Sequence, residues 1–247
     1  MNRSTLNFKI IQIDSGLSTN IYAQKLLRLE NVQEGHVLQT DFQKDGKGQH
    51  EKKWDADIGK NLLFSIILQP NLTVEEQFLL SKSISVGLKN YFDSMSVGEV
   101  KVKWPNDILI NGEKIAGILI ENSIYKSRIK FSVVGIGLNV NQLYFDDYQR
   151  PATSLIKLSG KKFKLKETLE EVLAYINSAY SLMFSNPNEL NKTYLQSLYG
   201  IGKPMEFEDK SGKFIGVILG VLPNGRLQLN YNGKLKDYDL KELKFLR

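Results

Sequence analysis

The sequence predicts an α+β fold, in which helices pack on a mixed, mostly antiparallel sheet and a small all-β unit follows. Three observations predict this class. Apolar runs typical of strands alternate with segments of helical apolar spacing as far as residue 199. The dipeptide Asn111-Gly112 separates two apolar runs, as in an antiparallel hairpin. The turn sequences DKSGK, LPNGR and YNGK divide 200–247 into short strands, which is typical of a small antiparallel barrel or meander.

The first part of the chain predicts three strands and two helices. The run 61–70, NLLFSIILQP, is too uniformly apolar to be half exposed, so we expect it at the centre of the sheet. Thr73 and Glu76 form a capping-box pattern, which predicts a helix that begins there and ends near Phe92. The other expected elements are strands over 8–14 and 36–42 and a helix with a Ser/Thr cap over 18–30.

From residue 99 onward the sequence predicts strands, then two helices, then short strands. Strands are expected over 99–104, 107–121 (the hairpin) and 128–141, and helices over 166–184 and 188–199. Near Gly200–Lys203 the helical pattern gives way to short strands. We therefore expect two domains, 1–199 and 200–247.

Composition limits the function classes. The 247 residues include no cysteine, which excludes disulfides and thiolate chemistry, and two histidines are too few for a histidine-rich metal site. No run reaches the length of a membrane span and the N-terminus lacks a signal-peptide core, so we expect a cytoplasmic protein. The net charge of +6 is compatible with nucleic acid, a phosphate-bearing substrate or an acidic protein partner, although the lysines mostly alternate with acids as on a solvated surface.

The loop 43–54, QKDGKGQHEKKW, lies between two predicted strands and is both cationic and rich in glycine. Gly46 and Gly48 allow close approach to a ligand, and Lys47 between them can bring a charge to a phosphate. A mobile surface turn would have the same composition. The loop is not a Walker motif, because GxxxxGK[ST] is absent.

The segment KWPND, followed by the hairpin, is the second candidate. Pro105 interrupts a strand-like run, so Trp104, Asn106 and Asp107 lie at a strand break where side chains can converge. Asp107 offers oxygen ligands for Mg²⁺, and Lys114 follows the tight turn. A Pro-Asn-Asp turn with its own Asx hydrogen bonds is the alternative.

Two further motifs complete the set. In GIGLNVN (135–141), the glycines allow a ligand to lie against the strand and Asn139 offers both a donor and an acceptor; the alternative is a bulged strand end. The hydroxyl and amide groups of Ser18-Thr19-Asn20 can match a neutral, urea-like group, or can serve only as a helix cap.

These four motifs, taken in their order along the chain, resemble those of the biotin–protein ligases over roughly residues 8–141. A C-terminal unit from about 200 is consistent with the same family. KWPND…GEKIAGILIE followed by GIGLNVN is a specific combination, and GKGQHEKKW resembles the family's Gly-Arg-Gly-Arg-x-x-Arg-x-Trp loop with Lys47 at the first arginine. The resemblance implies a fold similar to class II aminoacyl-tRNA synthetases and biotin ligases, with a small C-terminal SH3-like barrel. It implies that biotin and ATP, with Mg²⁺, give biotinyl-5′-AMP, and that biotin then passes to a lysine of a biotin carboxyl carrier protein.

The resemblance also implies site residues. Lys114, Lys47 and Asp107 would be catalytic, and Asp107 would contact the metal. The biotin-binding residues would be Ser18, Thr19, Asn20, Gln43, Gly46, Lys47, Gly48, Gln49, Lys114 and Gly117. The residues for ATP or the adenylate would be Lys47, Trp54, Lys103, Asn106, Asp107, Lys114 and Asn139. Family members occur as monomers and as dimers through the sheet, so a homodimer is one of the two expected states, and no membrane partner is expected.

The physical requirements of this reaction agree with the motifs. A carboxylate must attack the α-phosphorus of a polyanion, and the charges of Lys47 and Lys114 reduce that repulsion. The mixed anhydride hydrolyses readily, so a pliable cationic loop that closes over it, with Trp54 as an apolar wall, would protect it.

Three departures from the family pattern affect the expectations. Gln49 replaces the usual second arginine, so weaker retention of the adenylate is expected unless Lys52 or Lys53 substitutes. DSGLSTN holds three extra residues before Ser-Thr-Asn, which leaves Ser15 as an alternative to Ser18. No helix-turn-helix segment precedes residue 8, so no operator binding is expected.

Two other functions compete with this interpretation. A lipoate or octanoate ligase or transferase of the same superfamily would favour a more apolar pocket than Ser-Thr-Asn-Gln supplies. A nucleic acid-binding module would account for the pI of 9.2 and the barrel-like tail, but RLQLNYNGKLKDY is a weak candidate for a basic patch interleaved with aromatics.

Overall fold

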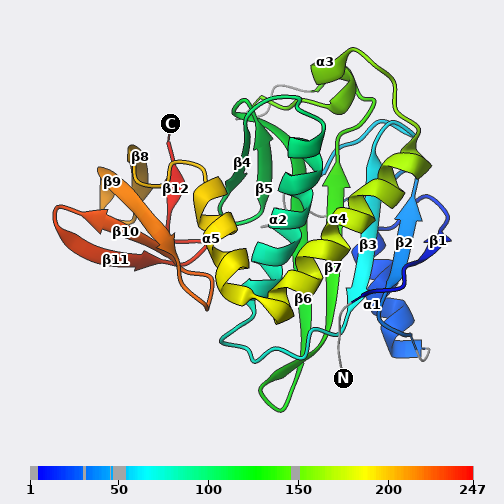
Figure 1. Ribbon diagram of the computed structural model, residues 1–247, viewed down its shortest axis with the longest axis horizontal. Coiled ribbons are helices and arrows are strands. Elements are labelled where there is room, and N and C mark those ends of the chain that lie inside the picture. Colours follow the sequence, from blue (N-terminus) through cyan, green and yellow to red (C-terminus); the bar gives the residue numbers. More distant parts are fainter. Residues whose placement is uncertain (1–4, 30–31, 45, 47–53, 146–150, 247) are drawn as a thin grey trace.

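A computed structural model describes residues 5–29, 32–44, 46, 54–145 and 151–246, and Figure 1 shows a large sheet with helices beside a smaller sheet. The large sheet has seven strands in the order β1-β2-β3-β7-β6-β5-β4, in which only β1 and β2 are parallel. The strands are β1 (Lys9–Gln12), β2 (His36–Thr40), β3 (Leu62–Leu68), β4 (Val100–Lys103), β5 (Asp107–Ile110), β6 (Glu113–Tyr125) and β7 (Arg128–Leu138). The mixed, mostly antiparallel sheet is therefore confirmed.

The helices occupy both faces of this sheet. They are α1 (Thr19–Leu29), α2 (Phe78–Ser94), α3 (Leu155–Ser159), α4 (Leu165–Ser185) and α5 (Pro187–Ser197). Helices α2 and α4 cover the face that Figure 1 shows in front. Strand β3 is buried over its whole length, as expected of a central strand. Because side chains alternate along a strand, Phe64 and Ile66 join the larger core with α2 and α4, whereas Ile67 joins a smaller one with Ala23 of α1.

Two local predictions have different outcomes. Asn111 and Gly112 both have positive φ, 51° and 84°, as the tight hairpin between β5 and β6 requires. Thr73 N and Oγ1 both donate to Glu76 Oε2 at 3.0 Å, yet α2 begins only at Phe78, so the predicted helix start is wrong. Backbone hydrogen bonds from Glu76 N to the Thr73 carbonyl and from Gln77 N to the Val74 carbonyl span three residues, so 73–77 forms tight turns and the regular α-helix starts one turn later.

The C-terminal segment forms a separate five-stranded antiparallel sheet. Its strands are β8 (Pro204–Asp209), β9 (Gly212–Val221), β10 (Leu227–Tyr231), β11 (Lys234–Tyr238) and β12 (Lys244–Phe245), in the order β11-β10-β9-β8-β12. The meander is confirmed. Within the described residues the edge strands β11 and β12 do not pair with each other, so the sheet is open and the expected SH3-like barrel is not confirmed.

A buried lysine links helices α2 and α5 to the smaller sheet. Lys82 of α2 is only 5% exposed, and its Nζ donates to Asn191 Oδ1 of α5 at 2.7 Å and to the Val221 carbonyl of β9 at 3.3 Å. The ammonium also lies over the rings of Phe78 and Tyr194. Burial without a carboxylate among these partners lowers the pKa of Lys82 from 10.5 to about 8.

Replacing Lys82 with methionine is expected to stabilise the protein near neutral pH. Between pH 8 and 10.5 the unfolded chain binds more protons at position 82 than the native protein does, so the stability of the native state rises with pH in this range. Below pH 8 the lysine is charged in both states, and the full cost of burying the charge is present. That cost is on the order of 3 kcal/mol, and we expect a gain of about 1–2 kcal/mol because Asn191 and Val221 lose a donor.

Urea unfolding at about pH 7 and about pH 9 measures both effects. Lys82→Met should unfold at higher urea than the wild type at the lower pH and should lose much of the rise in stability between the two. Lys89→Met is the matched control, because Lys89 lies on the same helix in an ion pair with Asp93. A rise in stability with pH that is equal in wild type and Lys82→Met would contradict the assignment.

Within the described residues, no helix has the length and apolar character that crossing a membrane requires.

Candidate active site

Three glycines leave a bare strip on the face of the sheet that carries α1. Gly117 of β6 pairs with Gly137 of β7, and Gly135 lies two residues further along β7. A Cβ atom on Gly135 would lie 2.3 Å from Asn20 Oδ1, and one on Gly137 would lie 2.3 Å from Trp54 Cε2. A Cβ atom on Gly117 would lie 2.8 Å from Trp54 Cζ3. These positions must therefore lack side chains for Asn20 and Trp54 to lie against the strands. We call Gly117, Gly135 and Gly137 the glycine floor.

A polar corner, formed by Thr19, Asn20, Gln43, Ser65 and Glu121, lies at one end of the glycine floor. Thr19 N donates to Gln43 Oε1 at 2.8 Å. Asn20 Nδ2 donates to Glu121 Oε2 at 2.7 Å. Ser65 Oγ lies 2.6 Å from Thr19 Oγ1 and 2.7 Å from Asn20 Oδ1. Ser18, Thr19 and Asn20 are all buried at the start of α1, whereas Ser15 is exposed.

Trp54 packs directly on the glycine floor. Its backbone N donates to the Gly46 carbonyl at 2.8 Å, which brings Gly46 and Trp54 together. A Cβ atom on Gly46 would lie 2.6 Å from the Trp54 carbonyl oxygen, so glycine is required there too. The indole lies over Gly117 and Gly137. Trp54 therefore separates the polar corner from the lysine described next.

An ion pair stands at the other end of the glycine floor. Lys114 Nζ lies 2.7 Å from Asp107 Oδ1 and 5.2 Å from the centre of the Trp54 ring. The side chain of Lys114 is 31% exposed and that of Asp107 is 19% exposed, so the pair is partly shielded yet accessible. The Lys114 backbone is fixed by the segment after position 150: its N donates to the Pro151 carbonyl and its carbonyl accepts from Thr153 N. The arrangement can place a cation beside an anion bound over the floor.

Three predicted nucleotide-binding residues have other partners in the structure. Asn106 Nδ2 donates to the Ile118 carbonyl at 2.7 Å, and the buried Asn139 donates through Nδ2 to the Thr153 carbonyl at 3.0 Å. Lys103 Nζ lies 4.8 Å from the ring centre of Phe245 in β12. Their roles toward ATP stay predictions. Lys47, Gly48 and Gln49, which were also predicted, lie outside the described residues.

Two residues of the polar corner were not predicted. Ser65 is the one polar residue in the apolar run LLFSIIL, and Glu121 ends the apolar run GILIE. A polar side chain inside an apolar strand is a usable signal, because it must find a hydrogen-bonding partner when it is buried.

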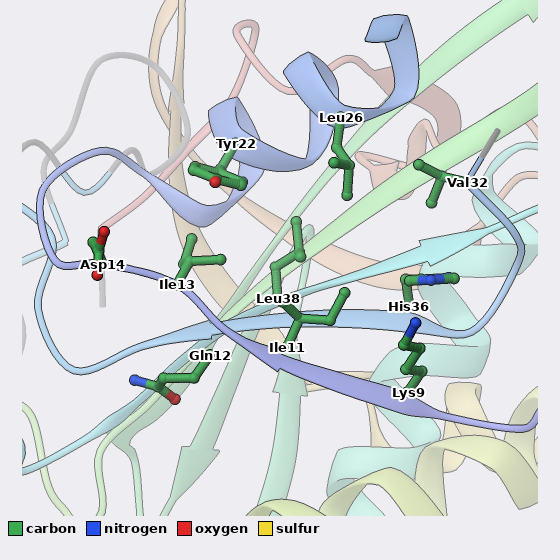
Figure 2. A pocket seen from close by; sticks show the side chains of 10 residues that line it. All are labelled: Lys9, Ile11, Gln12, Ile13, Asp14, Tyr22, Leu26, Val32, His36 and Leu38. Atoms are coloured by element: carbon green, nitrogen blue, oxygen red, sulfur yellow. The ribbon is translucent and has the colours of Figure 1, made fainter. Parts of the chain in front are cut away.

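A pocket lies between α1 and strands β1 and β2, with a volume of about 360 Å³ (Figure 2). Its walls include Ile11, Ile13 and Leu38, and none of the predicted site residues lines it. Figure 2 shows Asp14 at one end and Lys9 and His36 at the other, so its charged groups do not converge. The glycine floor, where polar groups do converge, is therefore the better candidate for chemistry.

Comparisons with known proteins agree with this location. The family model described as the biotin/lipoate A/B protein ligase family matches residues 13–139. The chain is 28% identical over 244 residues to the bifunctional ligase/repressor BirA of Bacillus subtilis, covering 91% of this chain and 75% of that protein. It is 29% identical over 209 residues to the biotin–[acetyl-CoA-carboxylase] ligase of Mycobacterium tuberculosis, covering 81% of this chain and 75% of that protein.

A solved structure extends the similarity to the whole chain. The biotin protein ligase from Aquifex aeolicus, in complex with biotin and ATP, superimposes with a TM-score of 0.77 at 25% identity. The superposition covers 97% of this chain and 99% of that one, so both sheets of the fold are included.

Proposed function

Because the chain belongs to the biotin/lipoate A/B protein ligase family, we propose that it is a biotin–protein ligase, which activates biotin with ATP and transfers it to an acceptor protein. One observation carries the proposal. A corner of buried hydroxyl and amide groups and a lysine–carboxylate pair lie at opposite ends of one glycine floor. Biotin has the same polarity: a urea-like ring at one end, an aliphatic chain, and a carboxylate at the other end.

Biotin would lie along the glycine floor. Ser18, Thr19, Asn20 and Gln43 bind the ureido ring, because a cyclic urea offers N–H donors and a carbonyl acceptor to such groups. The aliphatic chain lies along Gly117 and Gly137 once the Trp54 ring, which contacts both glycines in this structure, moves aside. The carboxylate then reaches Lys114, whose ammonium is already held at the end of the floor by Asp107.

The first chemical step joins two anions, so its barrier depends on positive charge. A biotin carboxylate oxygen forms a bond to the α-phosphorus of ATP, and the bond to pyrophosphate breaks, which gives biotinyl-5′-AMP. Lys114 reduces the repulsion before the reaction and stabilises the charge that develops during it. Lys47, Gly48 and Gln49 are assigned to the same carboxylate and phosphate from the sequence alone.

The second step transfers the biotinyl group. A lysine amine of a biotin carboxyl carrier protein attacks the carbonyl carbon of the adenylate, AMP leaves, and the amine loses a proton as the amide forms. Trp54 and the loop that it ends protect the mixed anhydride from water until the acceptor arrives. Residues 1–199 would carry both steps, and 200–247 would form the smaller unit beside the ATP end.

Mg²⁺ fits the ATP end of the site. Within the described residues no group of three or more His, Cys, Asp or Glu side chains could hold a metal by itself. Mg²⁺ is usually held by one or two carboxylates together with substrate phosphates. Asp107, beside Lys114, would supply the carboxylate, and the ion would neutralise phosphate charge when bound. Asn106, Lys103, Trp54 and Asn139 are the residues proposed to bind the rest of ATP.

Isothermal titration of the protein with biotin and with lipoate tests the proposal. We expect biotin to bind at least about 100-fold more tightly, because a site built for N–H and C=O groups rejects a ligand that leaves them unpaired. Equal affinity, or tighter binding of lipoate, would favour the lipoate or octanoate ligases of the same family. Binding of generic DNA that weakens with salt, with no binding of biotin, would favour a nucleic acid-binding module.

A further inference from the structure

We propose that Glu121 is a positioning residue that fixes the direction of the side-chain hydrogen bonds running from Asn20 through Ser65 to Thr19, so that the corner accepts N–H groups at Thr19. Glu121 itself would not contact the ligand. The inference rests on the proposed function, since it concerns how the same site selects a urea-like ring. It begins from a chain of four side chains that runs from Glu121 through Asn20 and Ser65 to Thr19.

The first step concerns the side-chain amide of Asn20. Its Nδ2 faces Glu121 Oε2 at 2.7 Å and the Leu119 carbonyl at 3.3 Å. A carboxylate and a backbone carbonyl can only accept hydrogen bonds, so the amino group of Asn20 must point toward them. Asn20 Oδ1 is thereby turned toward Ser65. Without Glu121, only the longer contact to the Leu119 carbonyl, at 3.3 Å, would hold this orientation.

The second step concerns the two hydroxyl groups. Ser65 Oγ lies 2.7 Å from Asn20 Oδ1, which can only accept, so the single hydrogen of Ser65 is used there. The 2.6 Å contact between Ser65 Oγ and Thr19 Oγ1 then requires Thr19 to donate. Ser65 and Thr19 are both buried, so no bulk water competes for these hydroxyl groups and reverses the direction of the two hydrogen bonds.

The third step concerns what the corner presents to a ligand. The Thr19 hydroxyl has given its hydrogen to Ser65, so only its lone pairs remain, and these accept an N–H. Gln43 Oε1 is occupied by Thr19 N, which leaves the Gln43 amino group as a donor. An acceptor next to a donor matches the N–H and C=O of a cyclic urea, whereas a dithiolane ring offers neither.

Four variants of the full chain, titrated with biotin and separately with ATP, test the inference. Glu121→Ala and Ser65→Ala are expected to weaken biotin binding about 10- to 100-fold and to change ATP affinity less than about 3-fold. Glu121→Gln should recover most of the loss, because its amide oxygen can still accept from Asn20. In steady-state assays the KM for biotin should rise while kcat stays nearly constant.

Ser132→Ala is the matched control for Ser65→Ala. Ser132 is buried on the adjacent strand β7, and its Oγ donates to Asn122 Oδ1 at 2.8 Å, away from the polar corner. The Ser132→Ala variant should bind biotin with the affinity of the wild type. Equal losses in the two serine variants, or wild-type affinity in Glu121→Ala, would overturn the inference and leave the proposed function intact. Failure of the wild type to bind biotin would overturn both.

Discussion

Replacing Lys114 with alanine is expected to lower biotin-dependent exchange between ATP and pyrophosphate by at least about 100-fold. Lys114 Nζ lies 2.7 Å from Asp107 Oδ1 at the end of the glycine floor, where the biotin carboxylate and the α-phosphate would meet. Removing the ammonium leaves two anions and the Asp107 carboxylate close together. The exchange assay reports adenylate formation alone, so the loss would be assigned to the first chemical step.

Lys101→Ala is the control for this experiment. Lys101 lies on β4, which β5 separates from the β6 strand of Lys114, and it pairs with Glu99 at 3.2 Å, so the variant removes the same charge from the same sheet outside the site. Its exchange rate should stay within about 3-fold of the wild type, as is usual for a surface ion pair. If Lys114→Ala also stayed within that range, Lys114 would have no role in charge stabilisation.

The Gly135→Ala variant is expected to lose biotin affinity by about 100-fold, which corresponds to about 2.7 kcal/mol. The new Cβ atom would lie 2.3 Å from Asn20 Oδ1, so Asn20 must move. Its hydrogen bonds to Glu121 and Ser65 are then lost together, and with them the arrangement of the polar corner. Titration with biotin measures the loss, and titration with ATP should give nearly the wild-type affinity.

The control for Gly135→Ala is Gly220→Ala in β9. A Cβ atom there would meet only the end of the Leu195 side chain, at 3.3 Å, and a flexible side chain can yield by that amount. Both variants should fold, which thermal unfolding checks. Wild-type biotin affinity in Gly135→Ala would show that the glycine floor is not where biotin lies.

Local patterns were enough to predict most of the fold. The apolar run around β3 predicted a central buried strand, and Asn111-Gly112 predicted the hairpin between β5 and β6, because each signal depends on neighbouring residues. The start of α2 could not be predicted from Thr73 and Glu76 alone. Both residues make their expected contact, but the backbone bonds that follow span three residues rather than four, so the α-helix proper starts a turn later.

The site was predicted in part for the same reason. The Ser-Thr-Asn motif, Gln43, the glycines and Lys114 belong to local motifs, and the structure brings them to one face of the sheet. Ser65 and Glu121 are 45 and 101 residues from Asn20, and only the pairing of β3, β7 and β6 places them beside it. The buried Lys82 likewise depends on contacts among α2, α5 and β9 that no single segment encodes.

The wild-type arm of the exchange assay tests the central claim most directly, which is that biotin is activated by ATP over the glycine floor. With radiolabelled pyrophosphate, we predict that label enters ATP only when biotin is present, and that lipoate at the same concentration does not replace it. Incorporation that is independent of biotin, or that depends on lipoate instead, would contradict the account.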